Sequence, residues 1–195
     1  MIVIGIDPGV DGGLAALQPG SATWVPPVVI RMPTITVLVG KGKKRRLDGA
    51  AIKTFLYLFE SETEERTVVL EKVHSMPRQG VASSFAFGET FGFLKGMCAM
   101  ADIPLELVTP QEWKKEILGG TNRDKGASIL RAHQLFPSAA TQIGKHDGMA
   151  EALLLAEYGR RRIGAGQMAL EPHVPEPPFG QAQDPPRATR ILSSG

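Results

Sequence analysis

The chain has 195 residues, of which 43% are hydrophobic and 22% charged, and its formal net charge is +2. This composition is that of a globular protein, so it excludes a wholly disordered or fibrous chain. The single cysteine, Cys98, excludes a disulfide framework and a cysteine-built zinc site. Because no apolar run approaches the roughly 18 residues of a membrane span, we expect a soluble intracellular protein that contacts no membrane.

The N-terminal part of the chain is predicted to form strands. Residues 2–6 are an uninterrupted apolar run, which is typical of a strand covered on both faces. The turn sequence DPG ends that run, and residues 14–17 are expected to return beside it as a hairpin. A third strand is predicted over residues 25–32.

Strands and helices alternate farther along the chain. The spacing of apolar residues predicts a helix over residues 50–60, preceded by Asp48 as its cap. The further expected elements are a strand over 67–70, a helix over 81–101, a strand over 103–108, a short helix over 109–113, and helices over 124–136 and 147–162. Hairpin strands followed by alternating strands and helices predict an α/β domain with a mixed sheet.

Three glycines recur every four residues in the longest predicted helix, at Gly88, Gly92 and Gly96. Glycine is costly inside a helix, so this stripe indicates close approach to a sheet, to another helix or to a second subunit. Packing within the core is the favoured interpretation, and the same is expected of Phe85 and Phe87.

The composition changes near the C-terminus. Six of the 15 prolines lie in residues 164–195, which show no helical or strand period. We therefore expect a folded domain over residues 1–163 followed by a disordered tail.

Acidic residues occupy matching places at the ends of predicted strands. Asp7 directly follows the first apolar run, and Glu71 follows the run VVL. Asp147 and Glu151 are four residues apart on one face of the last helix, beside His146. These three acidic elements could hold two divalent cations. Carboxylates supply the hard oxygen ligands that Mg²⁺ prefers. Two such cations would activate water and stabilise the leaving oxygen of a phosphodiester.

Each of these residues also has a purely structural interpretation. Asp7 suits a turn, Asp147 an N-cap, and Glu151 a favourable charge near a helix N-terminus. His146 alone is more often a surface or capping residue than a ligand. Taken together, the structural interpretations are less favoured than each is alone. Glu151 lies just before the strongly apolar run ALLLA, where a carboxylate is an awkward choice for structure alone.

Four stretches, in this order, indicate a family: IGIDPGVDGG, VVLEKVHSMPRQG followed by FAFGETFGFLKG, VTPQEWKK, and KHDGMAEALLLAEYG. Over about residues 1–162 the chain resembles the RuvC-type Holliday junction resolvases, especially those of phage type, in the RNase H-like superfamily. The resemblance implies an α/β fold with an RNase H-like mixed five-stranded sheet flanked by helices. By likeness, Asp7 is the catalytic aspartate of the first strand, Glu71 the glutamate that ends the fourth strand, and Asp147 and Glu151 the acids of the final helix.

The resemblance also implies cofactors and partners. Family members use Mg²⁺ or Mn²⁺, with two ions expected per active site, act as homodimers, and nick two strands of a four-way junction symmetrically. The expected location is the cytoplasm of a bacterial or phage-infected host cell. The chain departs from the family pattern in its last helix, where the two acids are usually three residues apart. Which of His146, Asp147 and Glu151 completes the metal site is therefore left open.

Two basic stretches are candidates for contact with DNA. The first is a run predicted to be a flexible loop that meets phosphates, which supply most sequence-independent affinity; it contains Lys41, Lys43, Lys44, Arg45 and Arg46. The second directly follows Glu71 and contains Lys72, His74, Met76, Arg78 and Gln79. Met76 is a candidate for stacking on unpaired bases. Lys114 is a secondary candidate for phosphate contact.

These observations predict a metal-dependent, structure-selective endonuclease that resolves four-way (Holliday) or other branched DNA junctions by symmetric phosphodiester nicking. Two alternatives belong to other classes. One is an actin-like or sugar-kinase-like ATPase domain, because IGIDPGVDGG also resembles the phosphate-loop hairpin of that fold. The other is a non-catalytic module that binds junctions.

Overall fold

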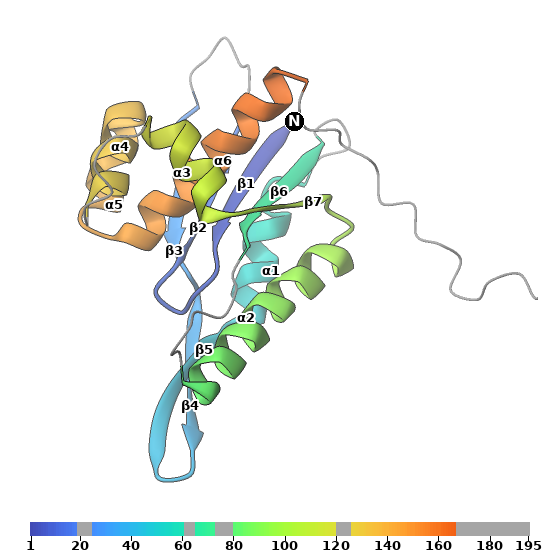
Figure 1. The fold of residues 1–195 in the computed structure, drawn as a ribbon. Helices are drawn as coiled ribbons and strands as arrows, with labels where there is room; N and C mark the ends of the chain where they lie inside the picture. Colours follow the sequence, from blue (N-terminus) through green and yellow to red (C-terminus); the bar gives the residue numbers. More distant parts are fainter. Residues whose placement is uncertain (19–24, 61–64, 73–79, 120–125, 167–195) are drawn as a thin grey trace, which may run out of the picture.

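A mixed five-stranded sheet forms the centre of the chain (Figure 1). The computed structural model describes residues 1–18, 25–60, 65–72, 80–119 and 126–166. In the order β3-β2-β1-β6-β7, the strands are β3 (Val28–Arg31), β2 (Gly13–Leu17), β1 (Ile2–Asp7), β6 (Arg66–Glu71) and β7 (Leu105–Val108). Strand β1 pairs antiparallel with β2 and parallel with β6, which confirms the predicted α/β class and mixed sheet.

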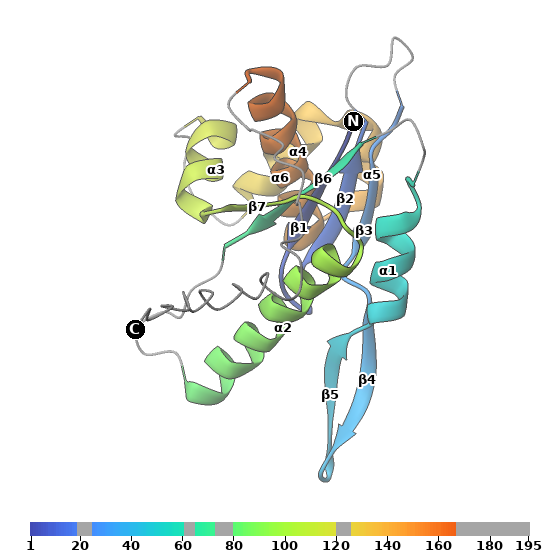
Figure 2. The same ribbon diagram turned by 90° about the vertical axis from the view of Figure 1, so that its right-hand side faces the viewer.

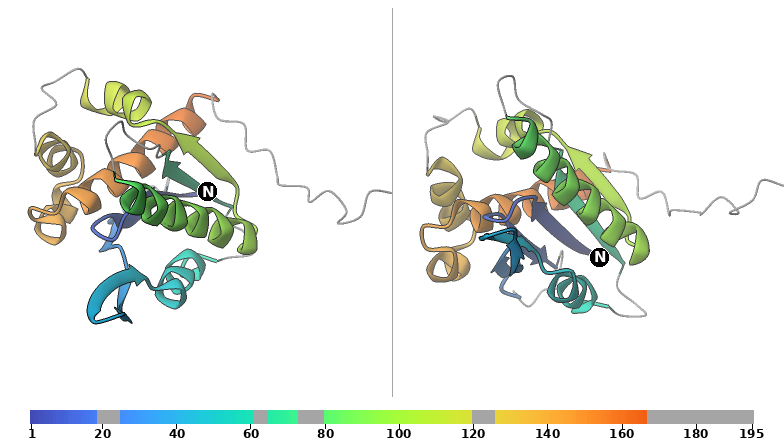
Figure 3. Two further views of the ribbon diagram at one scale, coloured as in Figure 1. Left: turned by 60° about the horizontal axis from the view of Figure 1, so that its bottom comes forward. Right: turned by 90° about the horizontal axis from the view of Figure 1, so that it is seen from below.

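Helices cover both faces of this sheet (Figures 2 and 3). One face packs against α1 (Gly49–Tyr57) and α2 (Val81–Met100). The other face packs against α3 (Pro110–Leu118), α4 (Ala127–Leu135), the short η1 (Pro137–Ala139), α5 (Ala140–Ile143) and α6 (Asp147–Gly164). The two apolar clusters meet at β1, where Val3 belongs to the cluster under α6 and Ile4 to the cluster under α1. The unbroken apolar run of β1 follows from this burial on both faces.

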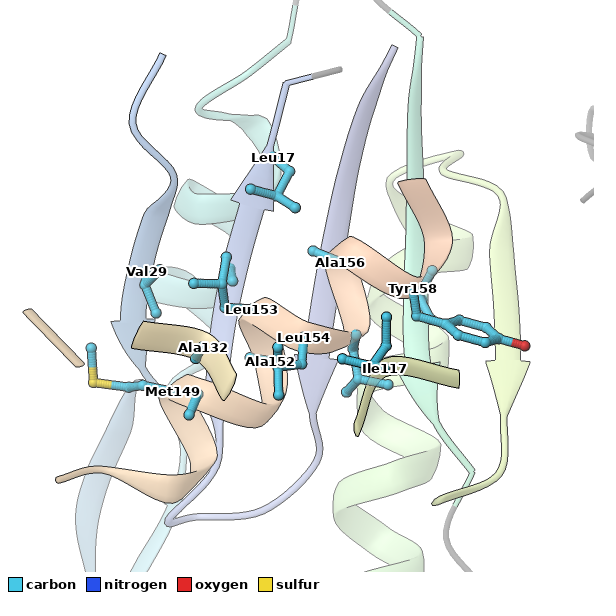
Figure 4. Close-up of a cluster of buried hydrophobic side chains, with 14 of the residues drawn as sticks. Leu17, Val29, Ile117, Ala132, Met149, Ala152, Leu153, Leu154, Ala156 and Tyr158 are labelled. Carbon is cyan, nitrogen blue, oxygen red and sulfur yellow. The ribbon is translucent and has the colours of Figure 1, made fainter. Parts of the chain in front are cut away.

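Helix α6 is the main element on its face and lies across β1 and β2. Figure 4 shows Ala152, Leu153 and Ala156 of α6 directed at the strands, close to Leu17 and Val29. All five side chains are buried. The apolar run ALLLA therefore attaches the helix to the sheet and fixes where its N-terminal turn lies.

Two glycines allow this helix to approach the sheet more closely than a side chain would permit. A Cβ atom on Gly5 of β1 would lie 2.0 Å from the carbonyl oxygen of Ala152. A Cβ atom on Gly148, in the first turn of α6, would lie 2.4 Å from the carbonyl oxygen of Asp11. The backbone of α6 therefore rests directly on β1 and on the turn between β1 and β2.

The residues at the starts of α1 and α3 act as helix caps. Asp48 caps α1, with its carboxylate accepting hydrogen bonds from the backbone N–H groups of Ala50 and Ala51 at 3.1 Å. Thr109 caps α3 through a capping box with Glu112. This cap begins a helix that continues to Leu118, beyond the short helix expected over residues 109–113.

The expectation that the glycine stripe of α2 packs in the core is wrong. A Cβ atom on Gly88, Gly92 or Gly96 would meet nothing within 4 Å among the described residues. Phe85 is 76% exposed and Phe87 38% exposed, so the predicted core position of these two phenylalanines is also wrong. The stripe lies on the side of α2 that faces away from the sheet.

The basic run is not a flexible loop. Residues of this run form β5 (Gly42–Leu47), which pairs antiparallel with β4 (Thr34–Val39) to make a separate two-stranded sheet. This hairpin projects from the body of the domain (Figure 2). Glycine and lysine are depleted in strands, but the β-branched residues of the facing strand supply a pairing partner that a residue-by-residue interpretation does not include.

The predicted tail, residues 164–195, lies outside the described residues from position 167 onward. Helix α6 ends at Gly164, and the expected end of the folded domain at residue 163 stays a prediction. Among the described residues, no helix combines the length and the apolar character needed to cross a membrane.

Candidate active site

Four carboxylates come to one end of the sheet. Asp7 ends β1 and Glu71 ends β6, and the parallel register that pairs Ile6 with Leu70 brings these two ends side by side. Asp147 begins α6, and Glu151 lies one turn farther along the same helix. The close contact of α6 with β1 therefore adds two helix carboxylates to the two from the strands.

Three of the four carboxylates border a cavity of about 850 Å³. Asp7, Asp147 and Glu151 line it, together with residues from the β1–β2 turn, from α2 and from the beginning of α4. Four glycines, Gly9, Gly12, Gly126 and Gly148, are among the lining residues.

Hydrogen bonds orient two of the four carboxylates. The indole N–H of the fully buried Trp113 donates to Oε2 of Glu71 at 2.7 Å. The Lys114 ammonium lies 2.8 Å from Oε1 of Glu151, and the Ser128 hydroxyl donates to the same oxygen at 3.0 Å. The adjacent residues Trp113 and Lys114 in α3 therefore hold one carboxylate from the sheet and one from α6.

The surroundings of Asp7 strongly raise its pKa. The pKa of Asp7 is raised to about 8, first by burial and then by the nearby charges of Glu151, Glu71 and Asp147. The ammonium of Lys114 acts in the opposite direction. A carboxyl group surrounded by other carboxylates ionises reluctantly, and a bound cation relieves that repulsion.

The residues fit a divalent cation by their chemistry. All four are carboxylates, which are the hard oxygen ligands that Mg²⁺ prefers. The pKa of Asp7 is raised first by burial and then by the charges of the other three. As the side chains stand, however, no three His, Cys, Asp or Glu residues of the described ranges form a ready-made cluster that could hold a metal ion. Glu151 is held by Lys114 and Glu71 by Trp113, so the carboxylates would have to turn toward a shared ion.

The two capping interpretations at the start of α6 are now resolved. The N-cap is His146, whose Nδ1 accepts a hydrogen bond from the backbone N–H of Met149 at 3.2 Å. Asp147 is the first helical residue, so its interpretation as an N-cap is wrong. The bond to Met149 occupies one of the two ring nitrogens of His146, the less certain of the predicted metal ligands.

The candidates for DNA contact fall into three groups. Lys41, Lys43 and Lys44 are exposed on the β4–β5 hairpin, and the structure shows no ion pair for them among the described residues. Arg45 and Arg46 bind carboxylates within the chain, Asp11 and Glu89 respectively. Lys72 is exposed directly after Glu71. His74, Met76, Arg78 and Gln79 lie outside the described residues.

Sequence reasoning missed the partners of the carboxylates. Lys114, a secondary candidate for phosphate contact, pairs with Glu151, and neither Trp113 nor Ser128 was expected in the site. These contacts join residues 23 to 42 positions apart. The motif VTPQEWKK is the one signal that pointed to this region.

Asp7 makes the stability of the cation-free protein depend on pH. Its pKa is raised from 3.8 to about 8 in the folded chain, so its favourable contribution is complete below about pH 4 and is lost as the pH rises toward 8. Asparagine cannot ionise. With a chelator present, Asp7→Asn should therefore be more stable than the wild type at pH 8, by on the order of 2–5 kcal/mol, and should differ little at pH 4. Urea unfolding at both pH values measures this, and parallel pH profiles would contradict it.

Comparison with known proteins places the fold. The chain matches no protein-family model and no curated protein sequence. Two structures of RuvC from Thermus thermophilus match it with TM-scores of 0.58, at 16% and 17% sequence identity. Each match covers 86% of this chain, and 98% and 97% of the respective RuvC chains. One of these structures is RuvC in complex with a Holliday junction substrate. The phage type expected from the sequence stays a prediction, whereas the fold of this chain is that of RuvC, an RNase H-like mixed sheet flanked by helices.

Proposed function

We propose that the protein is a metal-dependent, structure-selective endonuclease that nicks four-way (Holliday) or other branched DNA junctions. The observation that carries the proposal is the meeting of Asp7, Glu71, Asp147 and Glu151 at one end of the sheet, with the pKa of Asp7 raised to about 8. The RuvC fold supports it, because a RuvC of the same fold has been solved with a Holliday junction substrate.

The four carboxylates would hold Mg²⁺ or Mn²⁺, with two ions per site. When bound, such ions supply activation of water and stabilisation of the charge on the leaving oxygen. The chain itself then has little acid–base chemistry to perform. Its carboxylates fix the position of the ions, and the cavity of about 850 Å³ admits a phosphodiester strand.

Lys114 has a positioning role in this proposal. Its ammonium neutralises Glu151 and lowers the pKa of Asp7, so it favours the ionised carboxylates that a cation needs. Trp113 orients Glu71 from the same helix turn. Both residues act on the carboxylates and are therefore positioning residues of the site.

Two exposed regions would bind the DNA backbone. The lysines of the β4–β5 hairpin form no ion pair with any residue that the structure describes, and Lys72 lies beside Glu71 at the end of β6. Contacts of lysine with phosphate give affinity that does not depend on sequence. The segment 73–79, which contains the other predicted DNA-binding residues, continues from Lys72.

Assays of junction binding, of junction nicking and of ATP turnover separate this proposal from its two alternatives. A non-catalytic module would bind junctions without nicking them in Mg²⁺ or Mn²⁺. An ATPase domain would turn over ATP in the absence of DNA.

The first test removes the carboxyl charge of Asp7. Asp7→Asn is expected to abolish nicking of a four-way junction in Mg²⁺, because the variant loses a charged ligand, and to retain junction binding. Gel assays of nicking and fluorescence anisotropy of binding measure the two properties separately. The matched control is Asp102→Asn, an exposed aspartate after α2, which should nick like the wild type. Nicking by Asp7→Asn at the wild-type rate would contradict the proposal.

A homodimer is also part of the proposal, and α2 is its proposed interface. This helix is apolar around most of its circumference, with Phe85, Gly92 and Met100 on the side away from the sheet. A helix that is hydrophobic on all sides is usually buried. The three open glycines would allow two copies of α2 to approach closely. Symmetric nicking of two strands requires two active sites, which a dimer supplies.

Charge placed in the glycine stripe should disrupt the dimer. We expect the wild type to sediment as a dimer and Gly92→Glu as a monomer, because two buried carboxylates would face each other across the interface. The control is Gly164→Glu, since Gly164 is also an open helical glycine but lies at the end of α6. A monomeric wild type, or a dimeric Gly92→Glu variant, would contradict this part of the proposal.

A further inference from the structure

The β4–β5 hairpin has a feature that phosphate binding does not explain. Each of its strands has six residues, which gives an arm of about 20 Å that stands clear of the sheet (Figure 2). Between Thr34 and Leu47 it contains five basic residues and no acidic one. One strand is basic, and the other is largely aliphatic.

The aliphatic side chains are open to solvent. Leu38 is 78% exposed, Ile35 47% and Val39 44%. The register places Leu38 opposite Lys43 and Val37 opposite Lys44, so on each face of the ribbon an apolar side chain lies beside a cation. Lysines alone would protect a free strand edge from aggregation, but that role does not account for an exposed leucine near the tip.

Two arginines anchor the hairpin to the domain. Arg45 donates to the carboxylate of Asp11 and to the carbonyl oxygen of Val10, both in the turn that lines the carboxylate cavity. Arg46 pairs with Glu89 on α2. The inner end of the basic strand is therefore attached on two sides, and the outer end is left to project.

This attachment places the tip relative to the cavity. Leu38 lies opposite Lys43, which is two residues beyond Arg45, and Lys41 is four residues beyond it. At about 3.3 Å per residue these positions are about 7 and 13 Å farther along the arm. That distance corresponds to about two to four nucleotides of a stacked strand.

We propose that the tip of the hairpin is a wedge that enters the branch point of the DNA. Leu38 and Val39 would contact the faces of bases that have lost their stacking neighbours, and Lys41, Lys43 and Lys44 would contact the flanking phosphates. This inference rests on the proposed function, because it assumes a branched DNA substrate.

The two kinds of side chain would have different effects on binding. Phosphates are present equally in a duplex and in a junction, so the lysines supply affinity for both. Base faces are accessible only where stacking is broken, and apolar side chains inserted between base steps exploit such places. The aliphatic residues would therefore supply the preference for branched DNA over a paired duplex.

The test compares Leu38→Ser with Lys43→Gln/Lys44→Gln. The probes are a four-way junction that carries 2-aminopurine at its branch point and a fully paired duplex of equal length. The wild type should bind the junction more tightly and increase 2-aminopurine fluorescence, which reports lost stacking. Leu38→Ser should lose this increase and about tenfold of the preference for the junction, because serine buries far less apolar surface than leucine. The double lysine variant should lose affinity for both DNAs by the same factor, with a shallower salt dependence.

Controls separate the wedge from the fold and from the proposed function. Leu58→Ser replaces another exposed leucine, 60% accessible, at the end of α1, and should behave as the wild type. Leu38→Met keeps an apolar side chain and should retain the fluorescence increase. If Leu38→Ser binds the junction and raises fluorescence like the wild type, the wedge is refuted while the nuclease proposal stands. If the wild type shows no preference for the junction, the proposed substrate fails together with the wedge.

Discussion

Helix α6 lies with its backbone directly against strand β1, and the candidate site depends on this contact. Gly5 leaves no side chain between the helix and the strand, and Gly148 leaves none between the helix and the β1–β2 turn, since a Cβ atom on either would come within 2.4 Å of a backbone oxygen. The buried ALLLA face holds the helix in that position. As a result Asp147 and Glu151 reach the end of the sheet where Asp7 and Glu71 already lie. A longer separation would leave two carboxylates on the sheet and two on an unrelated surface.

Four carboxylates placed close together repel one another, and the surrounding residues reduce this repulsion. The pKa of Asp7 is raised to about 8 by burial and by its acidic neighbours, while Lys114 and Ser128 hold Glu151 and Trp113 holds Glu71. Without a cation, part of the negative charge is removed by protonation and part is offset by the ammonium. The formal charge of +2 for the whole chain conceals this separation between an acidic cavity and a basic hairpin.

The sheet and the four carboxylates could be predicted from sequence because their signals are local. Apolar runs marked β1 and β6, and an acid at the end of each run marked the site. The β4–β5 hairpin could not be predicted in the same way, because its basic strand exists through its pairing with the aliphatic one. Trp113 and Lys114 were missed as partners because their contacts span 42 and 37 positions. The exposure of the α2 glycine stripe depends on how the helix is turned relative to the sheet, which spacing alone does not reveal.

The central claim is that the contact of α6 with β1 assembles a cation-binding site, and Gly148→Ala tests it most directly. This variant keeps all four carboxylates but adds a methyl group 2.4 Å from the carbonyl oxygen of Asp11, so the start of α6 has to move. Calorimetric titration with Mn²⁺ should show binding to the wild type and to Gly164→Ala, whose new methyl group meets none of the described residues within 4 Å. Gly148→Ala, with its fold checked by circular dichroism, should bind Mn²⁺ far more weakly. Equal affinity of a folded Gly148→Ala variant, or no binding to the wild type, would contradict the account.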